Sequence, residues 1–273
     1  MREEEGKGVA ETEAWRDYLP LAHRLADASG AVILCYFRQS LAIEDKEHIA
    51  GYSPVTAADR EAEAAIRALI NESCPDHGIL GEEHGHERPD ARFTWVIDPI
   101  DGTKAFISGM PTWGTLIALQ DRGRGIIGVL DQPFLRERFV GHGEGACLGD
   151  RQLAVRSCSD LAGATLYATE PNMFTPAELA AFDALAARVR LRRFGADCYA
   201  YGMLAAGFVD LVVEASMNIW DIAALIPIVE GAGGLVTSWS GGPVGADGQV
   251  LAVGDRRLHA PALEILAPAA AAA

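Results

Sequence analysis

Two carboxylates three residues apart, Asp98 and Asp101, stand in the stretch VIDPIDGTKAF directly after an apolar run. The proline between them removes one backbone donor and Gly102 allows a sharp turn, so both side chains can point into one space. Carboxylates held together repel each other unless a cation or a shared proton lies between them. Carboxylate oxygens and a peptide carbonyl, here that of Ile100, are the hard ligands that Mg²⁺ accepts. The stretch therefore predicts a cation site at the end of a strand.

Other acidic residues can complete such a site. Glu82 follows the apolar pair Ile79-Leu80, and Asp221 follows Trp220 at the start of an apolar segment. A single aspartate at a helix start is usually an N-cap, so each residue alone has a purely structural interpretation. Together, carboxylates that all follow apolar segments favour one shared site.

The neighbouring histidines, His84 and His86, suggest zinc as an alternative metal because imidazole is a common zinc ligand. A site built from oxygen ligands favours Mg²⁺, so we interpret His84 as part of a loop wall. Trp113 and Trp220 are interpreted as packing residues, although an aromatic ring near the site could stack on an imidazole.

Four motifs carry a resemblance to a known family. They are SPVTAAD at 53–59, GEE at 81–83, DPIDGT at 98–103 and WDIAALIPIVEGAGG at 220–234. The order and spacing of these motifs, which extend over nearly the whole chain, resemble those of the inositol monophosphatase superfamily of Mg²⁺-dependent phosphatases. The resemblance implies a mixed α+β and α/β fold, a layered α-β-α-β-α sandwich, and commonly a homodimer. It also implies two to three Mg²⁺ ions and hydrolysis by metal-activated water in an in-line displacement, without a covalent phosphoenzyme.

The family's residue roles are carried over to the matching positions. The implied metal ligands are Glu82, Asp98, the Ile100 carbonyl, Asp101 and Asp221. Thr103 would position the attacking water, with Asp59 as its carboxylate partner and Glu82 also in a catalytic role. Gly102 and Thr103 offer backbone N–H groups at a helix start, which can hold the phosphate.

Two lysines are possible additions to the site. Lys46 matches a lysine near the metals, next to an apparent local insertion, EHIAGY. Lys104 follows the phosphate loop, where it can add positive charge near the substrate or be a solvated residue on a helix surface. Both interpretations of Lys104 stay open.

Other segments bear on which phosphate ester is cleaved. DGTKAFISGMPTWGT, GVLDQPF, ATEPNMF and RFGADCYAYGMLAAGFVDLVVE are similar to the histidinol-phosphate phosphatase branch, whose substrate carries an amine and an imidazole. Cationic groups call for carboxylates, so Asp197 and Glu214 are predicted to bind them, with Asp221 also at the substrate. Glu214 precedes Asp221 by seven residues, the spacing that in inositol phosphatases places a glutamate against the substrate's hydroxyls. The alternative for Asp197 is that it only caps the following helix.

Rival functions come from two directions. Inositol-1-phosphate phosphatase and 3′(2′),5′-bisphosphate nucleotidase activities would use the same metal ligands. A metal-binding regulatory protein without catalysis is the alternative from another class. Thr103 and Asp59 argue against that alternative, since a binding protein needs no pair of residues to activate water.

Composition limits the partners. The 273 residues include 38 acidic and 23 basic side chains, a formal charge of −15, which repels nucleic acid and anionic membrane surfaces. We therefore expect a small phosphorylated substrate, with bound cations reversing the field locally. The charged N-terminus lacks an apolar signal core, no apolar run reaches the ~20 residues of a membrane span, and the five cysteines are scattered. These features predict a cytoplasmic protein.

The surrounding pattern predicts two halves that share one interface. Residues 14–156 are expected to form an α+β half with an antiparallel meander from about 92 to 155 and most of the metal ligands. Residues 157–268 alternate strands and helices, which predicts an α/β half with the substrate-recognition residues. Helices are predicted over 15–37, softly broken near 30, and from about 57 to 74, 176–189, 199–206 and 221–230.

Overall fold

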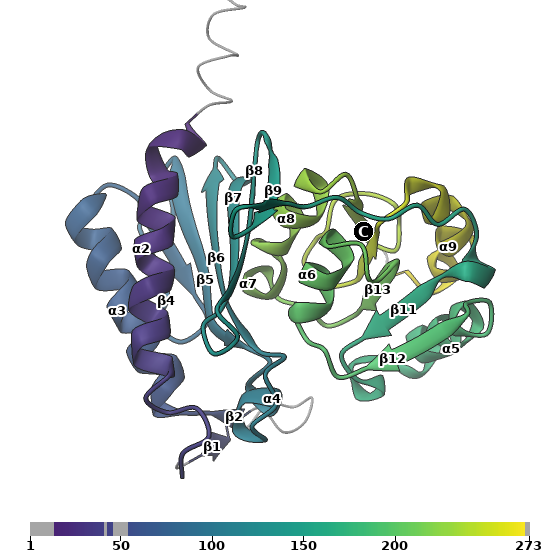
Figure 1. The fold of residues 1–273 in the computed structure, drawn as a ribbon, viewed down its shortest axis with the longest axis horizontal. Coiled ribbons are helices and arrows are strands. Elements are labelled where there is room, and N and C mark those ends of the chain that lie inside the picture. Colours follow the sequence, from purple (N-terminus) through teal and green to yellow (C-terminus); the bar gives the residue numbers. More distant parts are fainter. Residues whose placement is uncertain (1–13, 41–42, 46–53, 271–273) are drawn as a thin grey trace, which may run out of the picture.

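The computed structural model describes residues 14–40, 43–45 and 54–270. Two β-sheets alternate with three layers of helices along the long axis of the molecule (Figure 1). The layers are, in order, α2 with α3, an eight-stranded sheet, α6 with α7 and α8, a five-stranded sheet, and α5 with α9. The expected α-β-α-β-α sandwich is therefore the observed architecture.

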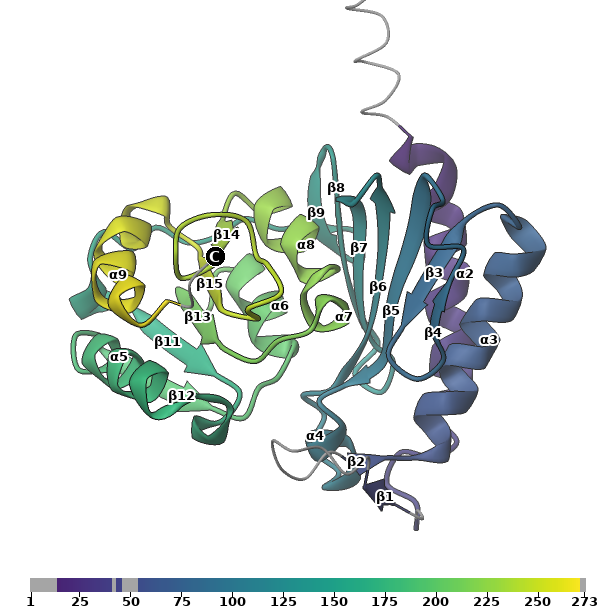
Figure 2. The same cartoon turned by 180° about the vertical axis from the view of Figure 1, so that it is seen from behind.

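The eight-stranded sheet has the order β10-β9-β8-β7-β6-β5-β3-β4. Neighbours from β5 to β10 pair antiparallel in chain order, which confirms the predicted meander. β3 adds to β5 in parallel, and β4 closes the edge beside α3 (Figure 2). The strands are β3 Gly78–Gly81, β4 Gly85–Glu87, β5 Phe93–Asp101, β6 Gly114–Asp121, β7 Arg124–Gln132, β8 Glu137–His142, β9 Gly145–Leu148 and β10 Arg151–Gln152.

Two long helices, α2 Trp15–Ile33 and α3 Ala57–Ser73, cover the outer face of this sheet (Figures 1 and 2). Each is amphipathic, with buried residues at helical spacing that pack against β5, β6 and β7. The expected break near Gly30 is wrong, because α2 continues to Ile33. Gly30 instead allows the turn after β7 to approach the helix, since a Cβ there would lie 3.1 Å from Pro133.

The five-stranded sheet has the order β12-β11-β13-β15-β14 and is mixed. β11 pairs in parallel with β12 and β13, whereas β15 pairs antiparallel with β13 and β14. The strands are β11 Thr165–Ala168, β12 Leu191–Phe194, β13 Leu211–Glu214, β14 Leu235–Thr237 and β15 Val250–Val253. The helices beyond it are α5 Pro176–Ala186 and α9 His259–Leu266, with 3₁₀ turns at 161–163, 171–173, 256–258 and 267–269.

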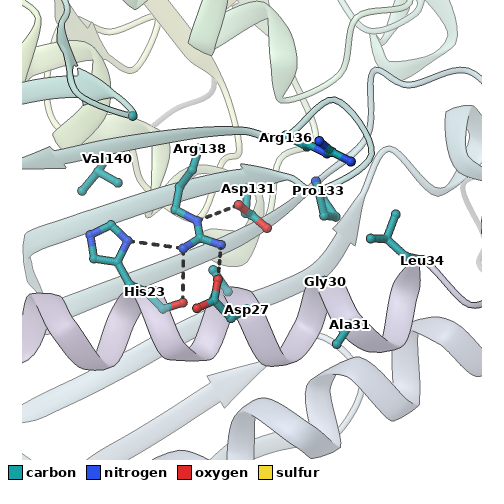
Figure 3. A pocket seen from close by; sticks show the side chains of 12 residues that line it. His23, Asp27, Gly30, Ala31, Leu34, Asp131, Pro133, Arg136, Arg138 and Val140 are labelled. Atoms are coloured by element: carbon teal, nitrogen blue, oxygen red, sulfur yellow. Dashed lines mark hydrogen bonds and ion pairs between the residues drawn. The ribbon is translucent and has the colours of Figure 1, made fainter.

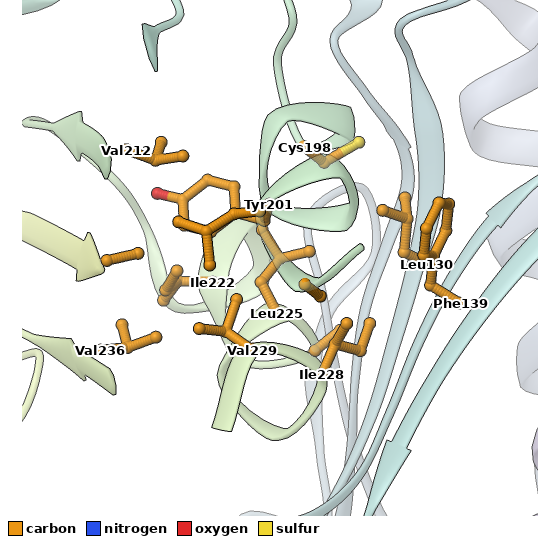
Figure 4. Close-up of a cluster of buried hydrophobic side chains, with 14 of the residues drawn as sticks. Leu130, Phe139, Cys198, Tyr201, Val212, Ile222, Leu225, Ile228, Val229 and Val236 are labelled. Carbon is orange, nitrogen blue, oxygen red and sulfur yellow. The ribbon is translucent and has the colours of Figure 1, made fainter. Parts of the chain in front are cut away.

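The middle helices are α6 Tyr199–Ala205, α7 Ile219–Ile222 and α8 Leu225–Gly231. The predicted single helix over 221–230 is thus two short helices, the first of which begins two residues earlier, at Ile219. Pro227 explains the break, because its ring lacks an N–H and clashes with the carbonyl four residues earlier, at Ala223. Apolar side chains of these helices and of both sheets form one cluster, including Leu130, Val212 and Leu225 (Figure 4). Both sheets thus share this cluster with the middle helices. The division into two halves at residues 156 and 157 stays a prediction.

Short elements complete the described chain. β1 Glu44–Asp45 and β2 Pro54–Val55 form a two-stranded ribbon, and α4 Thr103–Ile107 follows β5. Among the described helices, none combines the length and apolar character that a membrane span needs.

Candidate active site

A cavity of about 260 Å³ lies where the end of β5 meets α6, β13 and α7. Six of the predicted carboxylates line it, although they come from positions 82 to 221: Glu82, Asp98, Asp101, Asp197, Glu214 and Asp221. Ile100, Gly102, Thr103 and Lys104 line the same cavity. The fold therefore gathers in one place most of the residues that the sequence singled out.

The end of β5 owes its shape to a β-bulge. Pairing with β6 passes from Asp98 opposite Leu116 to Asp101 opposite Gly114, so β5 has one extra residue between them. The buried Thr115 hydroxyl donates to the Pro99 carbonyl at 2.8 Å and fixes the bulge. β5 thus continues through Asp98 to Asp101, and the bulge aims both carboxylates at the cavity.

Three carboxylates, Asp98, Asp101 and Asp221, offer oxygens that lie within 4.8 Å of one another. Each accepts a hydrogen bond from a backbone N–H. The donors are Ile100 to Asp98 at 3.0 Å, Cys198 to Asp101 at 2.8 Å, and Asn218 to Asp221 at 2.7 Å. One oxygen of each carboxylate is thereby held by the backbone, which orients the group toward its neighbours.

The electrostatics of this cluster favour a bound cation. Burial, followed by the charges of Glu82 and Asp101, raises the pKa of Asp98 well above its ordinary value. Burial, followed by Asp221 and Asp197, does the same to the pKa of Asp101. Like charges in a low-dielectric site disfavour the ionised forms, and a multivalent cation removes that penalty.

Glu82 is positioned by residues that the sequence analysis did not single out. Its N–H donates to the Ile97 carbonyl at 3.2 Å. The following turn is held by the fully buried Glu63 of α3, which accepts from the Glu83 N–H at 2.8 Å and from Arg67 Nε at 2.7 Å. The E-x-x-x-R spacing on a predicted helix was the available signal for this ion pair.

Gly102 and Thr103 form the start of α4. Gly102 has φ +84°, and a Cβ there would lie 2.9 Å from the Asp197 Cβ, so glycine is required on both counts. The Thr103 hydroxyl donates to the Ile100 carbonyl at 3.1 Å.

Asp59 does not bond to Thr103 in this structure. Its carboxylate accepts from the Thr56 N–H at 2.8 Å and the Thr56 hydroxyl at 2.7 Å, which is the capping box of α3. The pKa of Asp59 is raised, first by burial and also by the nearby charge of Glu82. Its catalytic role stays a prediction.

Asp197 and Glu214 flank the cluster from the C-terminal half. Asp197 lies before α6 with φ +46°, and its carboxylate accepts from the Thr112 hydroxyl at 3.3 Å. The capping alternative is not observed, since α6 has no side-chain cap. Burial raises the pKa of Asp197 to about 6. Glu214 is buried, accepts from the Thr169 N–H and hydroxyl at 3.1 Å each, and has a pKa raised by burial to about 8.

Lys104 is the only basic residue among the described residues that line the cavity, and it is half exposed. Its ammonium group donates to Glu170, a lining residue from the segment after β11 that the sequence analysis missed. This ion pair spans the two halves across the cavity. Lys46 lies outside the described residues.

The predicted zinc alternative gains no support from the described histidines. His84 Nε2 lies 3.1 Å from the Arg60 carbonyl, and the cavity is lined by neither His84 nor His86. Trp113 is fully buried against Phe37 and Phe106, which confirms its packing role, and Trp220 packs against the middle core.

A second hollow, of about 570 Å³, lies between α2 and the β7–β8 turn (Figure 3). Its carboxylates face an arginine: Arg138 Nε donates to Asp131 at 2.7 Å and Nη2 donates to Asp27 at 2.8 Å. The same guanidinium donates to the His23 carbonyl at 3.3 Å. This hollow is larger than the carboxylate cavity, and its buried Asp131 is paired with Arg138 through Oδ1. The other oxygen, Oδ2, has no hydrogen-bond partner among the described residues.

Comparison with known proteins agrees with the geometry of the cavity. A model of the inositol monophosphatase family matches residues 15–273. The chain belongs to this family. The bulged Asp98 to Thr103 segment and the Asp221 helix start are therefore parts of a phosphatase fold.

The similar proteins carry the names of different phosphatases. The chain is 43% identical over 270 residues to a bifunctional phosphatase, IMPL2, of Arabidopsis thaliana, covering 94% of this chain and 77% of that protein. It is 37% identical over 236 residues to a histidinol-phosphatase of Chlorobaculum parvum, covering 85% and 90%. The structure of an inositol monophosphatase from Zymomonas mobilis superposes with a TM-score of 0.85 at 43% identity, covering 93% and 99%.

Proposed function

We propose that the protein is a Mg²⁺-dependent phosphate monoester hydrolase that converts L-histidinol phosphate to L-histidinol and phosphate, a step of histidine biosynthesis. The observation that carries the proposal is the cluster of Asp98, Asp101 and Asp221, three carboxylates within 4.8 Å held by backbone amides. Carboxylate oxygens of this density fit Mg²⁺ better than a softer metal. Family membership supports phosphate ester hydrolysis as the reaction.

The residues that would hold two to three Mg²⁺ ions are those already placed around the cavity: Glu82, Asp98, the Ile100 carbonyl, Asp101 and Asp221. When bound, the ions would supply a water of lowered pKa and offset negative charge on the ester. The Ile100 carbonyl accepts from Thr103 here, so the threonine hydroxyl already lies against the proposed ligand set. That position suits the water-orienting role that the family resemblance implies for Thr103.

The chain's own residues would bind the two ends of the substrate. Gly102 and Thr103 present backbone N–H groups to the phosphate at the start of α4. Asp197 and Glu214 lie on the C-terminal side of the cavity, where they would bind the amine and imidazole through charge-assisted hydrogen bonds. The name of the Chlorobaculum parvum relative supports this substrate, whereas the Zymomonas mobilis structure favours inositol phosphate as a second candidate.

The decisive experiment measures phosphate release from L-histidinol phosphate, inositol 1-phosphate and a 3′,5′-bisphosphate nucleotide, each with Mg²⁺ and with EDTA. The proposal requires Mg²⁺-dependent turnover with the highest kcat/KM on L-histidinol phosphate. A higher value on either other ester replaces the substrate but keeps the phosphatase. Metal binding without turnover of any ester would identify the regulatory alternative.

The substrate end is tested with Asp197→Asn combined with Glu214→Gln. We expect KM for L-histidinol phosphate to rise about 10- to 100-fold, because each substitution turns a charge-assisted hydrogen bond into a weaker neutral one. KM for inositol 1-phosphate, which has no cationic group, should change much less. Equal losses on both esters would refute the charge-recognition role.

A homodimer and a cytoplasmic location stay predictions. Sedimentation tests the first, and cell fractionation tests the second.

A further inference from the structure

Tyr201 of α6 has a buried hydroxyl that finds no hydrogen-bond partner among residues 14–40, 43–45 and 54–270. The side chain is 1% exposed and packs within the apolar cluster of the middle layer (Figure 4). In the described part of the chain, nothing lies within hydrogen-bonding distance of its oxygen. Buried hydroxyls are nearly always paired, because leaving one unpaired costs about as much as a lost hydrogen bond. Phenylalanine would fill the same apolar space without this cost, so the hydroxyl calls for a partner beyond the described residues.

The position of Tyr201 indicates where that partner lies. The residue lines the carboxylate cavity together with Cys198 and Glu214. Burial first, and then the nearby charges of Glu214, Asp101 and Asp221, raise the pKa of its hydroxyl well above the ordinary value. Glu214 is the side chain proposed for the alcohol end of the substrate, whereas the phosphate would lie at Gly102 and Thr103 on α4. Tyr201 therefore belongs to the alcohol end.

We propose that the Tyr201 hydroxyl hydrogen-bonds a nitrogen or hydroxyl group on the alcohol part of the substrate, beside Glu214, and thereby contributes to substrate choice. The proposal rests on the proposed phosphatase function of this cavity. A tyrosine hydroxyl is protonated at neutral pH and both donates and accepts, so it suits an amine, an imidazole or a sugar-like hydroxyl. An apolar alcohol would leave it unpaired and would be disfavoured.

The same helix offers a matched control. Tyr199 lies two residues earlier, and its hydroxyl donates to Glu137 of β8 rather than lining the cavity. Tyr199→Phe and Tyr201→Phe remove the same atom from the same helix. The first removes a hydrogen bond to Glu137, and the second removes only a hydroxyl that has no partner in the described part of the chain.

The experiment compares KM and kcat of both variants and the unmodified protein on L-histidinol phosphate and on phenyl phosphate, whose alcohol part has no polar group. Tyr201→Phe should raise KM for L-histidinol phosphate about 3- to 10-fold, the value of one neutral hydrogen bond, and leave phenyl phosphate unchanged. Its melting temperature should not fall, whereas that of Tyr199→Phe should fall while KM is kept. These results together support a substrate contact.

Unchanged KM in Tyr201→Phe would overturn the proposal and assign the hydroxyl to a buried water. An equal rise on phenyl phosphate, or an equal rise in Tyr199→Phe, would overturn it in favour of a packing effect. If the unmodified protein prefers inositol 1-phosphate, the histidinol assignment fails, and the same comparison on that ester still tests Tyr201. If no ester is hydrolysed, the phosphatase proposal fails. Calorimetric binding of L-histidinol phosphate then decides, and equal affinity of the unmodified protein and Tyr201→Phe overturns the role of the hydroxyl.

Discussion

The eight-stranded sheet carries two sets of buried carboxylates that differ in what neutralises them. On β7, Asp131 faces Arg138, which also bonds Asp27 of α2. On β5, Asp98 and Asp101 face further carboxylates, and within the described chain no basic side chain forms an ion pair with either. Burial raises the pKa of Asp131, but the Arg138 hydrogen bond opposes that rise. At Asp98 the neighbouring charges of Glu82 and Asp101 add to it.

This difference separates a structural ion pair from a ligand site. A buried carboxylate paired with an internal arginine already has its charge neutralised, and removing the arginine would leave that charge uncompensated. Carboxylates that repel each other are a cost in the folded chain, and that cost is removed when a cation binds. In the hollow by α2 an arginine pairs with the carboxylates, whereas the carboxylates of the smaller cavity are left to bind a cation.

The largest expected effect comes from Asp101→Asn. We expect kcat with saturating Mg²⁺ to fall about 10⁴-fold, since a carboxylate proposed to hold the metal is lost while the amide can still accept from Cys198. Asp131→Asn is the matched control on β7 and should keep kcat within a few-fold. Phosphate release measures both, and a fully active Asp101→Asn protein would remove the basis of the proposed site.

Arg138→Met tests whether Arg138 neutralises the buried Asp131 of β7. Removing the guanidinium leaves Asp131 buried beside an apolar chain, which should lower the free energy of unfolding by about 3 kcal/mol. Urea unfolding measures the loss, and kcat per folded molecule should stay unchanged. Adding Asp131→Asn to Arg138→Met should restore part of the stability. An undiminished unfolding free energy would show that Arg138 does not neutralise Asp131.

The repelling carboxylates should also make the metal-free protein sensitive to pH. Burial raises the pKa of Glu214 from 4.5 to about 8, so the folded state holds a proton that the unfolded state has released. The stability from this group is complete below pH 4.5 and is lost as pH rises toward 8. In EDTA, this should lower the unfolding free energy by about 2 kcal/mol between pH 5 and pH 7.

Glu214→Gln is the control for this pH dependence, because the amide cannot ionise but can still accept from Thr169. Its unfolding free energy in EDTA should depend less on pH by a similar amount. Chemical denaturation at several pH values measures both proteins. The same slope in both would contradict the role of Glu214.

The smallest effect is expected from Lys104→Met, which frees Glu170 at the cavity. An exposed ion pair is worth less than ~1 kcal/mol, so KM for L-histidinol phosphate should fall no more than about five-fold as Glu170 becomes available to a cationic substrate. Inositol 1-phosphate should show no such gain. A large rise in KM on both esters would instead mean that Lys104 binds the phosphate, the other interpretation left open by the sequence.

Much of the cavity could be predicted because its chemistry is local. Asp98, Asp101 and Thr103 lie within six consecutive residues, and their types predict a cation and a phosphate without further context. The bulge at Pro99 could not be predicted, since it depends on the hydroxyl of Thr115 from the next strand. The break between α7 and α8 was missed although Pro227 is visible in the sequence, because apolar spacing alone suggested one helix.

The family, the layered fold and the kinds of group at the site could all be inferred from the order of the residues. Which of those groups are neutralised, and which stay available to a ligand, depends on how the chain folds. Asp101 accepts from the Cys198 N–H, 97 residues away, and Glu63 holds the turn of Glu82 from a separate helix. The proposed role of the Tyr201 hydroxyl rests on the structure, which shows no partner for it among the described residues. Pairing and burial depend on which distant segments pack together, and spacing along one chain does not contain that information.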